Sequence, residues 1–169
     1  NRPLDDIRPG SALEWSQTLR RLSPRLAESL LVKELEGRAG HLDLWVERAS
    51  ALDEMGRQRE ALAVLSSVLT ASDDAEGHMT LADLLSRRGA TLEQVTGHLA
   101  SAIDQLGDVV MPRARLIRGR ASLQNPGRKF SATIQDLREL WQERRDLERP
   151  LPELQLATTY AQALFERSS

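Results

Sequence analysis

The chain contains no cysteine, few aromatic residues and no long apolar run, and each shortage excludes a class of protein. Without Cys among its 169 residues, it forms neither disulfides nor thiolate-ligated metal sites. Its apolar runs fall far short of the roughly 18 residues that indicate a membrane span, and no signal-peptide pattern opens the chain. The sequence therefore predicts no membrane insertion by this segment.

The residues that are abundant favour helices. Leu, Ala, Arg and Glu dominate, and these side chains lose little entropy in a helix, whereas aromatic residues make up only 4%. Arg outnumbers Lys by 21 to 2, as is typical of GC-rich bacterial genomes. The absence of Cys fits a bacterial cytoplasm or periplasm equally well. Because the chain begins with Asn1 and not Met, we expect it to be a fragment of a longer protein.

One stretch of 34 residues, Leu42 to Ala75, carries the clearest pattern. Small residues, Ala49 and Ala61, occur once in each half, and Gly56 lies between the halves. Two helices approach closely at small residues, while a glycine with positive φ ends the first helix without steric cost. Bulky residues that would fill the seam between the helices are Trp45, Leu52 and Leu65, and the small-to-medium Val68 follows Leu65 in the second half.

This spacing resembles the tetratricopeptide repeat, a helix-turn-helix unit of about that length. The resemblance implies an all-α fold: an antiparallel helix-pair solenoid in a right-handed superhelix, with capping helices at both ends. A second repeat follows, since Gly89 lies 33 residues after Gly56 and Thr91 to Gln94 reads as a capping box. Gly119 marks a weaker third repeat.

The predicted organisation is an extended arm over 1–10, followed by a single domain over 11–169. A capping box at Ser11 to Glu14 is expected to open its first helix. Its parts are a divergent repeat or cap (11–41), two repeats (42–75 and 76–108), a divergent repeat (109–149) and a capping helix (151–167).

No catalytic or metal-binding pattern is present. The three histidines, His41, His78 and His98, show no ligand spacing, and no phosphate loop or nucleophile elbow occurs. Asp73 and Asp74 are interpreted as a solvated turn, and His78 as a partly buried packing residue. We therefore expect a chain that is not an enzyme and uses no metal or cofactor.

Charge is distributed unevenly along the chain. Residues 42–76 contain eight acidic and three basic side chains, whereas 111–130 contain six basic and no acidic ones. This pattern is compatible with ordinary solvated helix faces, or with a groove that has an acidic end and a basic end. Nucleic acid is a poorer partner, because the basic stretch lacks interleaved aromatic residues and lies beside acidic helices.

The resemblance also implies where a partner would bind, on the concave face formed by the first helix of each repeat. Val46, Met79 and Leu116 would form an apolar centre suited to an amphipathic helix or extended segment. The Lys and Asn residues with which some family members clamp a carboxylate are absent here. The expected contact residues are Asp43, Val46, Glu47, Ser50, Asp53, Glu54, Glu76, Met79, Thr80, Asp83, Arg113, Leu116 and Arg120.

The function expected from these patterns is a non-catalytic scaffold of a larger bacterial protein that binds a partner protein or peptide. One version places it in an envelope export or secretion assembly. Two alternatives stay open: a sensor domain of a transcriptional or signalling regulator, and a structural or oligomerisation domain of an enzyme. We expect a monomer or weak self-association.

Overall fold

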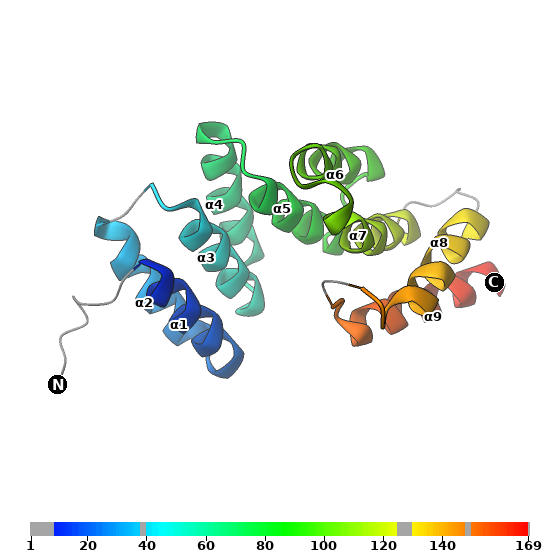
Figure 1. The fold of residues 1–169 in the computed structure, drawn as a ribbon, viewed down its shortest axis with the longest axis horizontal. Helices are drawn as coiled ribbons and strands as arrows, with labels where there is room; N and C mark the ends of the chain where they lie inside the picture. The colour runs from blue at the N-terminus through cyan, green and yellow to red at the C-terminus, as the bar shows by residue number, and fades with distance from the viewer. Residues whose placement is uncertain (1–8, 38–39, 125–129, 148–149, 169) are drawn as a thin grey trace. The chain divides into compact units, whose positions relative to one another are not determined.

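The computed structural model describes residues 9–37, 40–124, 130–147 and 150–168, and this part of the chain is built from helices (Figure 1). No strand occurs among these residues. The all-α class predicted from composition is therefore confirmed.

The chain divides into two compact units, residues 1–80 and 81–169, whereas the sequence analysis treated 11–169 as one domain. The division falls inside helix α5 (Ala75–Arg87), so no linker separates the units. Within each unit, contacts concentrate between consecutive helices.

In the first unit each helix contacts the next one, and α1 also contacts α3. Short connections between contacting helices reverse the chain direction, so neighbouring helices run antiparallel. The helices that lie wholly in this unit are α1 (Pro9–Leu22), α2 (Pro24–Gly37), α3 (Leu42–Glu54) and α4 (Gln58–Ala71).

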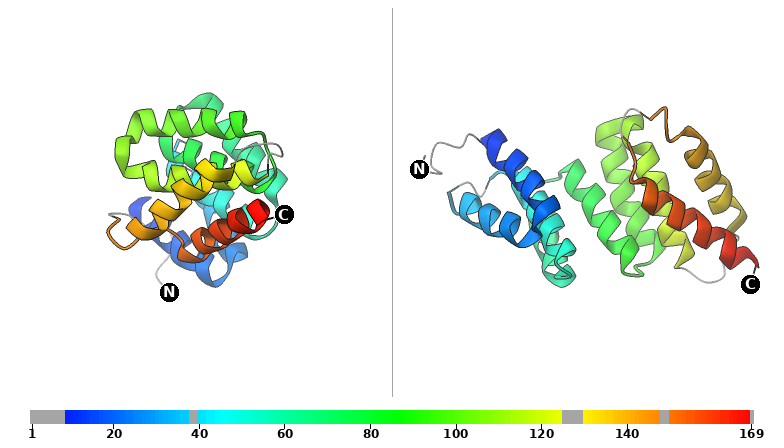
Figure 2. Two further views of the ribbon diagram at one scale, coloured as in Figure 1. Left: turned by 90° about the vertical axis from the view of Figure 1, so that its right-hand side faces the viewer. Right: turned by 90° about the horizontal axis from the view of Figure 1, so that it is seen from below.

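The second unit repeats this arrangement. α6 contacts α7, α7 contacts α8, α8 contacts α9, and α7 also contacts α9. Figure 2 shows α8 and α9 side by side at the C-terminal end of this unit. Its elements after α5 are α6 (Leu92–Leu106), a 3-10 turn η2 (Gly107–Val110), α7 (Met111–Leu123), α8 (Phe130–Glu143) and α9 (Glu153–Ser168).

Helix ends fall where the sequence predicted them. Gly56 and Gly89 have φ of 75° and 74°, the left-handed conformation that closes a helix without a Cβ clash. Thr91 Oγ1 accepts from the Gln94 amide at 3.3 Å, and the Thr91 amide donates to Gln94 Oε1 at 3.1 Å. This reciprocal pair is the predicted capping box, and Gly107 ends α6 with φ of 66°.

The N-terminal prediction needs a correction. Pro9 and Gly10 belong to α1 and not to an extended arm, while residues 1–8 lie outside the described part. Ser11 is therefore inside the helix and cannot be its N-cap. Proline is tolerated in the first turn because its missing N–H has no helical acceptor there, so the helix begins before the serine that we took as its start.

Small residues bring the helices together. Ala49 of α3 and Ala61 of α4 are 0% exposed, as expected for the seam of a helix pair. In the second unit, Gly119 of α7 lies so close to Leu137 of α8 that an added Cβ would be 3.0 Å from a leucine methyl. The interhelical distance at each of these positions leaves little room for a larger side chain.

We expect Ala61→Leu to destabilise the chain by about 1–3 kcal/mol, because the extra side chain overpacks the α3–α4 seam. Ala63 lies on the exposed side of the same helix, so Ala63→Leu is the matched control and should be nearly neutral. Urea unfolding followed by circular dichroism measures both. Equal midpoints for the two variants would contradict this packing.

Candidate functional site

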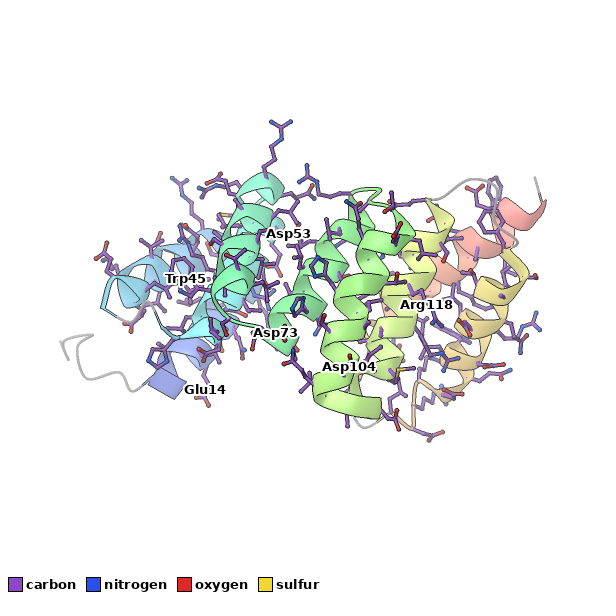
Figure 3. The ribbon with its side chains drawn as sticks, turned by 90° about the horizontal axis from the view of Figure 1, so that it is seen from above. Glu14, Trp45, Asp53, Asp73, Asp104 and Arg118 are labelled. Atoms are coloured by element: carbon purple, nitrogen blue, oxygen red, sulfur yellow. The ribbon has the colours of Figure 1, made fainter. Side chains whose placement is uncertain are left out.

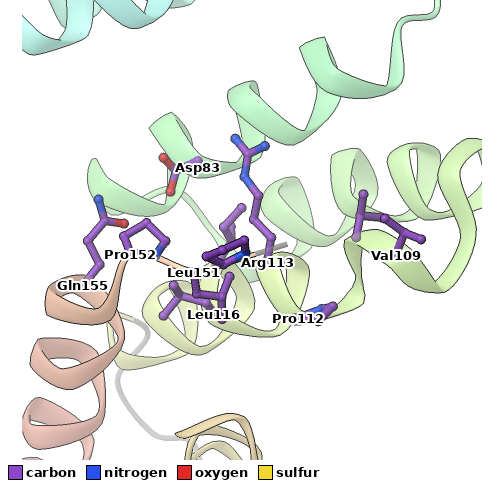
Figure 4. Close-up of a pocket in the computed structure, with 11 residues that line it drawn as sticks. Asp83, Val109, Pro112, Arg113, Leu116, Leu151, Pro152 and Gln155 are labelled. Carbon is purple, nitrogen blue, oxygen red and sulfur yellow. The ribbon is translucent and has the colours of Figure 1, made fainter. Parts of the chain in front are cut away.

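The second unit contains a pocket of about 340 Å³ (Figure 4). Eight of its eleven lining residues are apolar, and the other three are polar or charged. The lining residues come from α5, from the η2–α7 junction and from the segment that leads into α9: Asp83, Val109, Val110, Pro112, Arg113, Leu116, Ile117, Pro150, Leu151, Pro152 and Gln155.

Proline and anchored leucine make the walls of the pocket rigid. Leu151 is 9% exposed and belongs to the core cluster that includes Leu116 and Leu156, so it fixes the segment before α9 against α7. Pro150 and Pro152 flank Leu151 and have restricted φ angles. The pocket is therefore shaped by the core, and its form does not depend on long flexible side chains.

A hydrogen-bonded network holds the polar edge. Arg120 Nη1 donates to Asp83 Oδ1 at 2.7 Å, and Arg120 Nη2 donates to Gln155 Oε1 at 3.1 Å. Arg87 Nη2 donates to the other Asp83 oxygen at 2.9 Å. The Arg120 side chain is only 13% exposed. One arginine of α7 thus connects α5 to the start of α9 through two residues that line the pocket, Asp83 and Gln155.

The pocket has one acidic lining residue, Asp83, whose carboxylate accepts hydrogen bonds from Arg120 and Arg87. None of its described lining residues is a Ser, Thr, Cys, His, Lys or Tyr. Apolar walls with a few polar groups at the edge are the usual composition of a ligand site, and the volume is at the low end of the range for such sites.

Three residues predicted from the sequence, Asp83, Arg113 and Leu116, line this pocket together, and Arg120 stands beside it. Figure 4 shows Arg113 extending from α7 at one side of the pocket. The residues around Leu151 were not among those expected from the sequence. Pro150 and Pro152, on either side of Leu151, do indicate a backbone segment of restricted conformation.

The apolar centre of the predicted groove needs a correction. Val46, Met79 and Leu116 are 8%, 0% and 2% exposed, because their side chains are part of the packed interior. A partner cannot contact Val46 or Met79 without opening the core. Thr80 is also buried, at 6% exposed. Of the three residues of the predicted apolar centre, Leu116 is among those that line the pocket.

Two of the four predicted acidic residues of α3 share a basic partner within the first unit. Arg20 of α1 donates to Glu47 Oε1 at 2.7 Å and also to Glu54. Burial lowers the pKa of Arg20, but the hydrogen bonds and charges of both glutamates outweigh it and raise the pKa above its usual value. Arg20 was not among the residues expected from the sequence. Glu47 and Glu54 are seven positions apart and therefore lie on one face of the helix, which is compatible with a shared basic partner.

The other predicted residues of α3 and α5 differ in exposure. Asp43 and Glu54 are exposed, and Asp53 is 8% exposed. Ser50 is partly buried and donates to the Val46 carbonyl at 3.1 Å, within its own helix. Glu76 is also partly buried.

The basic segment of the chain is likewise paired within its own unit. Arg115 donates to Glu143 at 3.1 Å and to Glu139 at 3.3 Å, and Arg118 (labelled in Figure 3) donates to Asp136 at 2.7 Å. The acidic partners lie on α8, outside the segment that showed only basic residues. The charge separation along the sequence is therefore not a separation in space at these positions, which favours the interpretation as ordinary helix faces there.

Asp73 and Asp74 lie in the connection between α4 and α5, and His78 lies in the first turn of α5. Their contacts are local. His78 Nε2 lies 2.7 Å from Asp73 Oδ1, and the side chains are 12% and 74% exposed (Asp73 is labelled in Figure 3). Asp74 Oδ2 accepts from the Gly77 amide at 2.6 Å, as at a helix N-terminus. Among the described residues, no group of three or more His, Cys, Asp or Glu could hold a metal ion.

Comparison with protein-family models, with curated proteins and with solved structures gives no match. In the part of the chain that the structure describes, no helix has the length and apolar character that crossing a membrane requires.

We expect the contact between Asp83 and Arg120 to stabilise the second unit more than the contact between Asp83 and Arg87. The Arg120 side chain is more buried, and its hydrogen bonds join three helices, whereas Arg87 is on the same helix as Asp83 and 36% exposed. Double-mutant cycles with Asp83→Asn, Arg120→Met and Arg87→Met should give a coupling of about 1–3 kcal/mol for Arg120. The Arg87 coupling should be below about 1 kcal/mol. Similar couplings in urea unfolding would contradict this ranking.

Proposed function

We propose that the chain is a non-catalytic interaction scaffold, built from tetratricopeptide-like helix pairs, that binds a partner protein or peptide. The observation that carries the proposal is the recurrence of one geometry in consecutive helix pairs. Gly56 and Gly89 adopt the same left-handed conformation at a spacing of 33 residues, and the small residues Ala49 and Ala82 precede them by seven positions with 0% exposure. Repeats of this kind present extended surfaces for protein binding.

The pocket of the second unit supports the same function. Most of its lining residues are apolar, Leu151 ties it to the core, and the charged groups Asp83 and Arg113 lie among them. We propose it as the place where a side chain of the partner inserts. The charged groups at its edge would then orient the partner and influence the association rate more than the lifetime of the complex.

A useful probe must change the pocket without changing the core. Val109 lines the pocket and is 40% exposed, so Val109→Glu adds a charge at the rim at little cost to folding. Leu22 is 80% exposed and belongs to the first unit, so Leu22→Glu makes the same kind of change at a position outside the pocket. Met79 is unsuitable for this purpose, because a charge at a fully buried position unfolds the helix pair.

The test uses the purified chain as bait in a lysate of its own organism, followed by calorimetry with the purified partner. We expect saturable binding that Val109→Glu weakens about tenfold or more, a loss of roughly 1.4 kcal/mol, while Leu22→Glu changes it less than about twofold.

The two parts of the proposal fail separately. If no protein binds the wild-type chain saturably, the scaffold function is wrong. If Val109→Glu binds as the wild type does, the scaffold function stands and the pocket is not the site.

A further inference from the structure

Helix α9 carries apolar residues on two opposite faces. One face holds Leu156 and Ala163, both 0% exposed, which belong to the core cluster of the second unit. The other face holds Leu154 and Phe165, which are 81% and 71% exposed. A surface helix normally has one apolar stripe that faces its own core, so the second stripe calls for a separate explanation.

The exposed stripe is continuous along the helix. At about 100° per residue, Leu154, Thr158, Ala161 and Phe165 lie within roughly 60° of one another, on the side opposite Leu156 and Ala163. Thr158 and Ala161 are exposed as well. The stripe therefore has a large residue at each end and small residues in the middle.

The spacing and the order of side-chain sizes in this stripe are the same when it is read from either end. The spacings are four, three and four positions, and the residues are large, small, small and large. Two antiparallel copies of such a stripe match each other about a twofold axis. Leu154 of one copy then faces Phe165 of the other, and Thr158 faces Ala161.

We propose that this face of α9 binds α9 of a second copy of the chain in an antiparallel pair. Small residues at the centre let two helix axes approach closely where they cross, and large residues fill the space where the axes diverge. A C₂ dimer uses the same surface on both subunits, and the symmetric order of side-chain sizes places the twofold axis at the small residues in the middle of the stripe. This inference is independent of the partner binding proposed above.

Charges at the ends of the helix favour the antiparallel direction. The N-terminal end of each α9 carries partial positive charge and would lie near Glu166 of the other copy. Glu153, at that same end, is held 3.5 Å from Arg144 Nε, which offsets its negative charge. The antiparallel pair therefore brings a carboxylate to a helix end that attracts it.

The size of the contact sets the strength of the dimer. A helix of 16 residues is about 24 Å long, and one helix pair covers less than the roughly 1,200–2,000 Å² of a stable interface. The dimer is therefore weak and reversible, and its population rises with protein concentration.

The first experiment is sedimentation velocity of the full chain across a hundredfold concentration range. We expect the wild type to shift from monomer to dimer, and Leu154→Glu and Phe165→Glu to remain monomeric with unchanged circular dichroism. Leu22→Glu removes an equally exposed leucine from the first unit and should dimerise as the wild type does. A wild type that stays monomeric, or a dimer unaffected by Phe165→Glu, overturns the proposal.

The second experiment determines direction, and the absence of cysteine makes it possible. Thr158→Cys and Ala161→Cys are prepared separately, mixed, oxidised and analysed by intact mass. The antiparallel pair predicts that the mixed disulfide between the two variants dominates over either like-with-like product. Dominant like-with-like disulfides would indicate a parallel pair and overturn the proposed arrangement.

Discussion

Close approach of helices at small residues is the constraint on which the rest of this structure depends. Ala49 and Ala61 are fully buried in the first unit, and Gly119 lies against Leu137 in the second. A small residue lets the neighbouring helix come near enough for the leucines on either side to interlock, and dispersion contacts accumulate only at that distance. The positions of these small residues thus determine which helix faces become core and which remain available for partners.

Electrostatics in this chain mainly connects helices that are already packed. Arg20 joins α1 to α3, Arg115 and Arg118 join α7 to α8, and Arg120 joins α7 to both α5 and α9. Arginine suits this role because its planar guanidinium donates in several directions at once. The chain has only two lysines, so most of its positive charge is on arginine. In the described part of the basic segment, Arg115, Arg118 and Arg120 all form ion pairs.

The pocket and the outer face of α9 arise from the same local architecture. Leu151 and Leu156 anchor the segment that leads into α9, which leaves a cavity beside α7 and turns Leu154 and Phe165 away from the core. Partner binding at the pocket and self-association through α9 would therefore use adjacent but distinct surfaces of the second unit.

The sequence by itself determined the local structure of this protein. Glycine at 56 and 89, the capping box at Thr91 and the spacing of small and bulky residues all act within one or two turns of chain, so helix ends and the buried seam followed from them. Local rules did not locate the first helix equally well, since Pro9 starts α1 ahead of Ser11.

Tertiary structure alone decided which residues are available at the surface. Val46 and Met79 had the right register for a binding face, yet neighbouring side chains cover them. Arg20 and Glu47 are 27 positions apart, and Arg120 and Asp83 are 37 apart, so their pairing depends on how helices pack and not on any local pattern. Burial and ion pairing depend on two or more helices together. For this reason, counts of charged residues along the chain overstated the separation of acidic and basic charge in space. For the same reason, the pocket beside Leu151 could be recognised only in the folded structure.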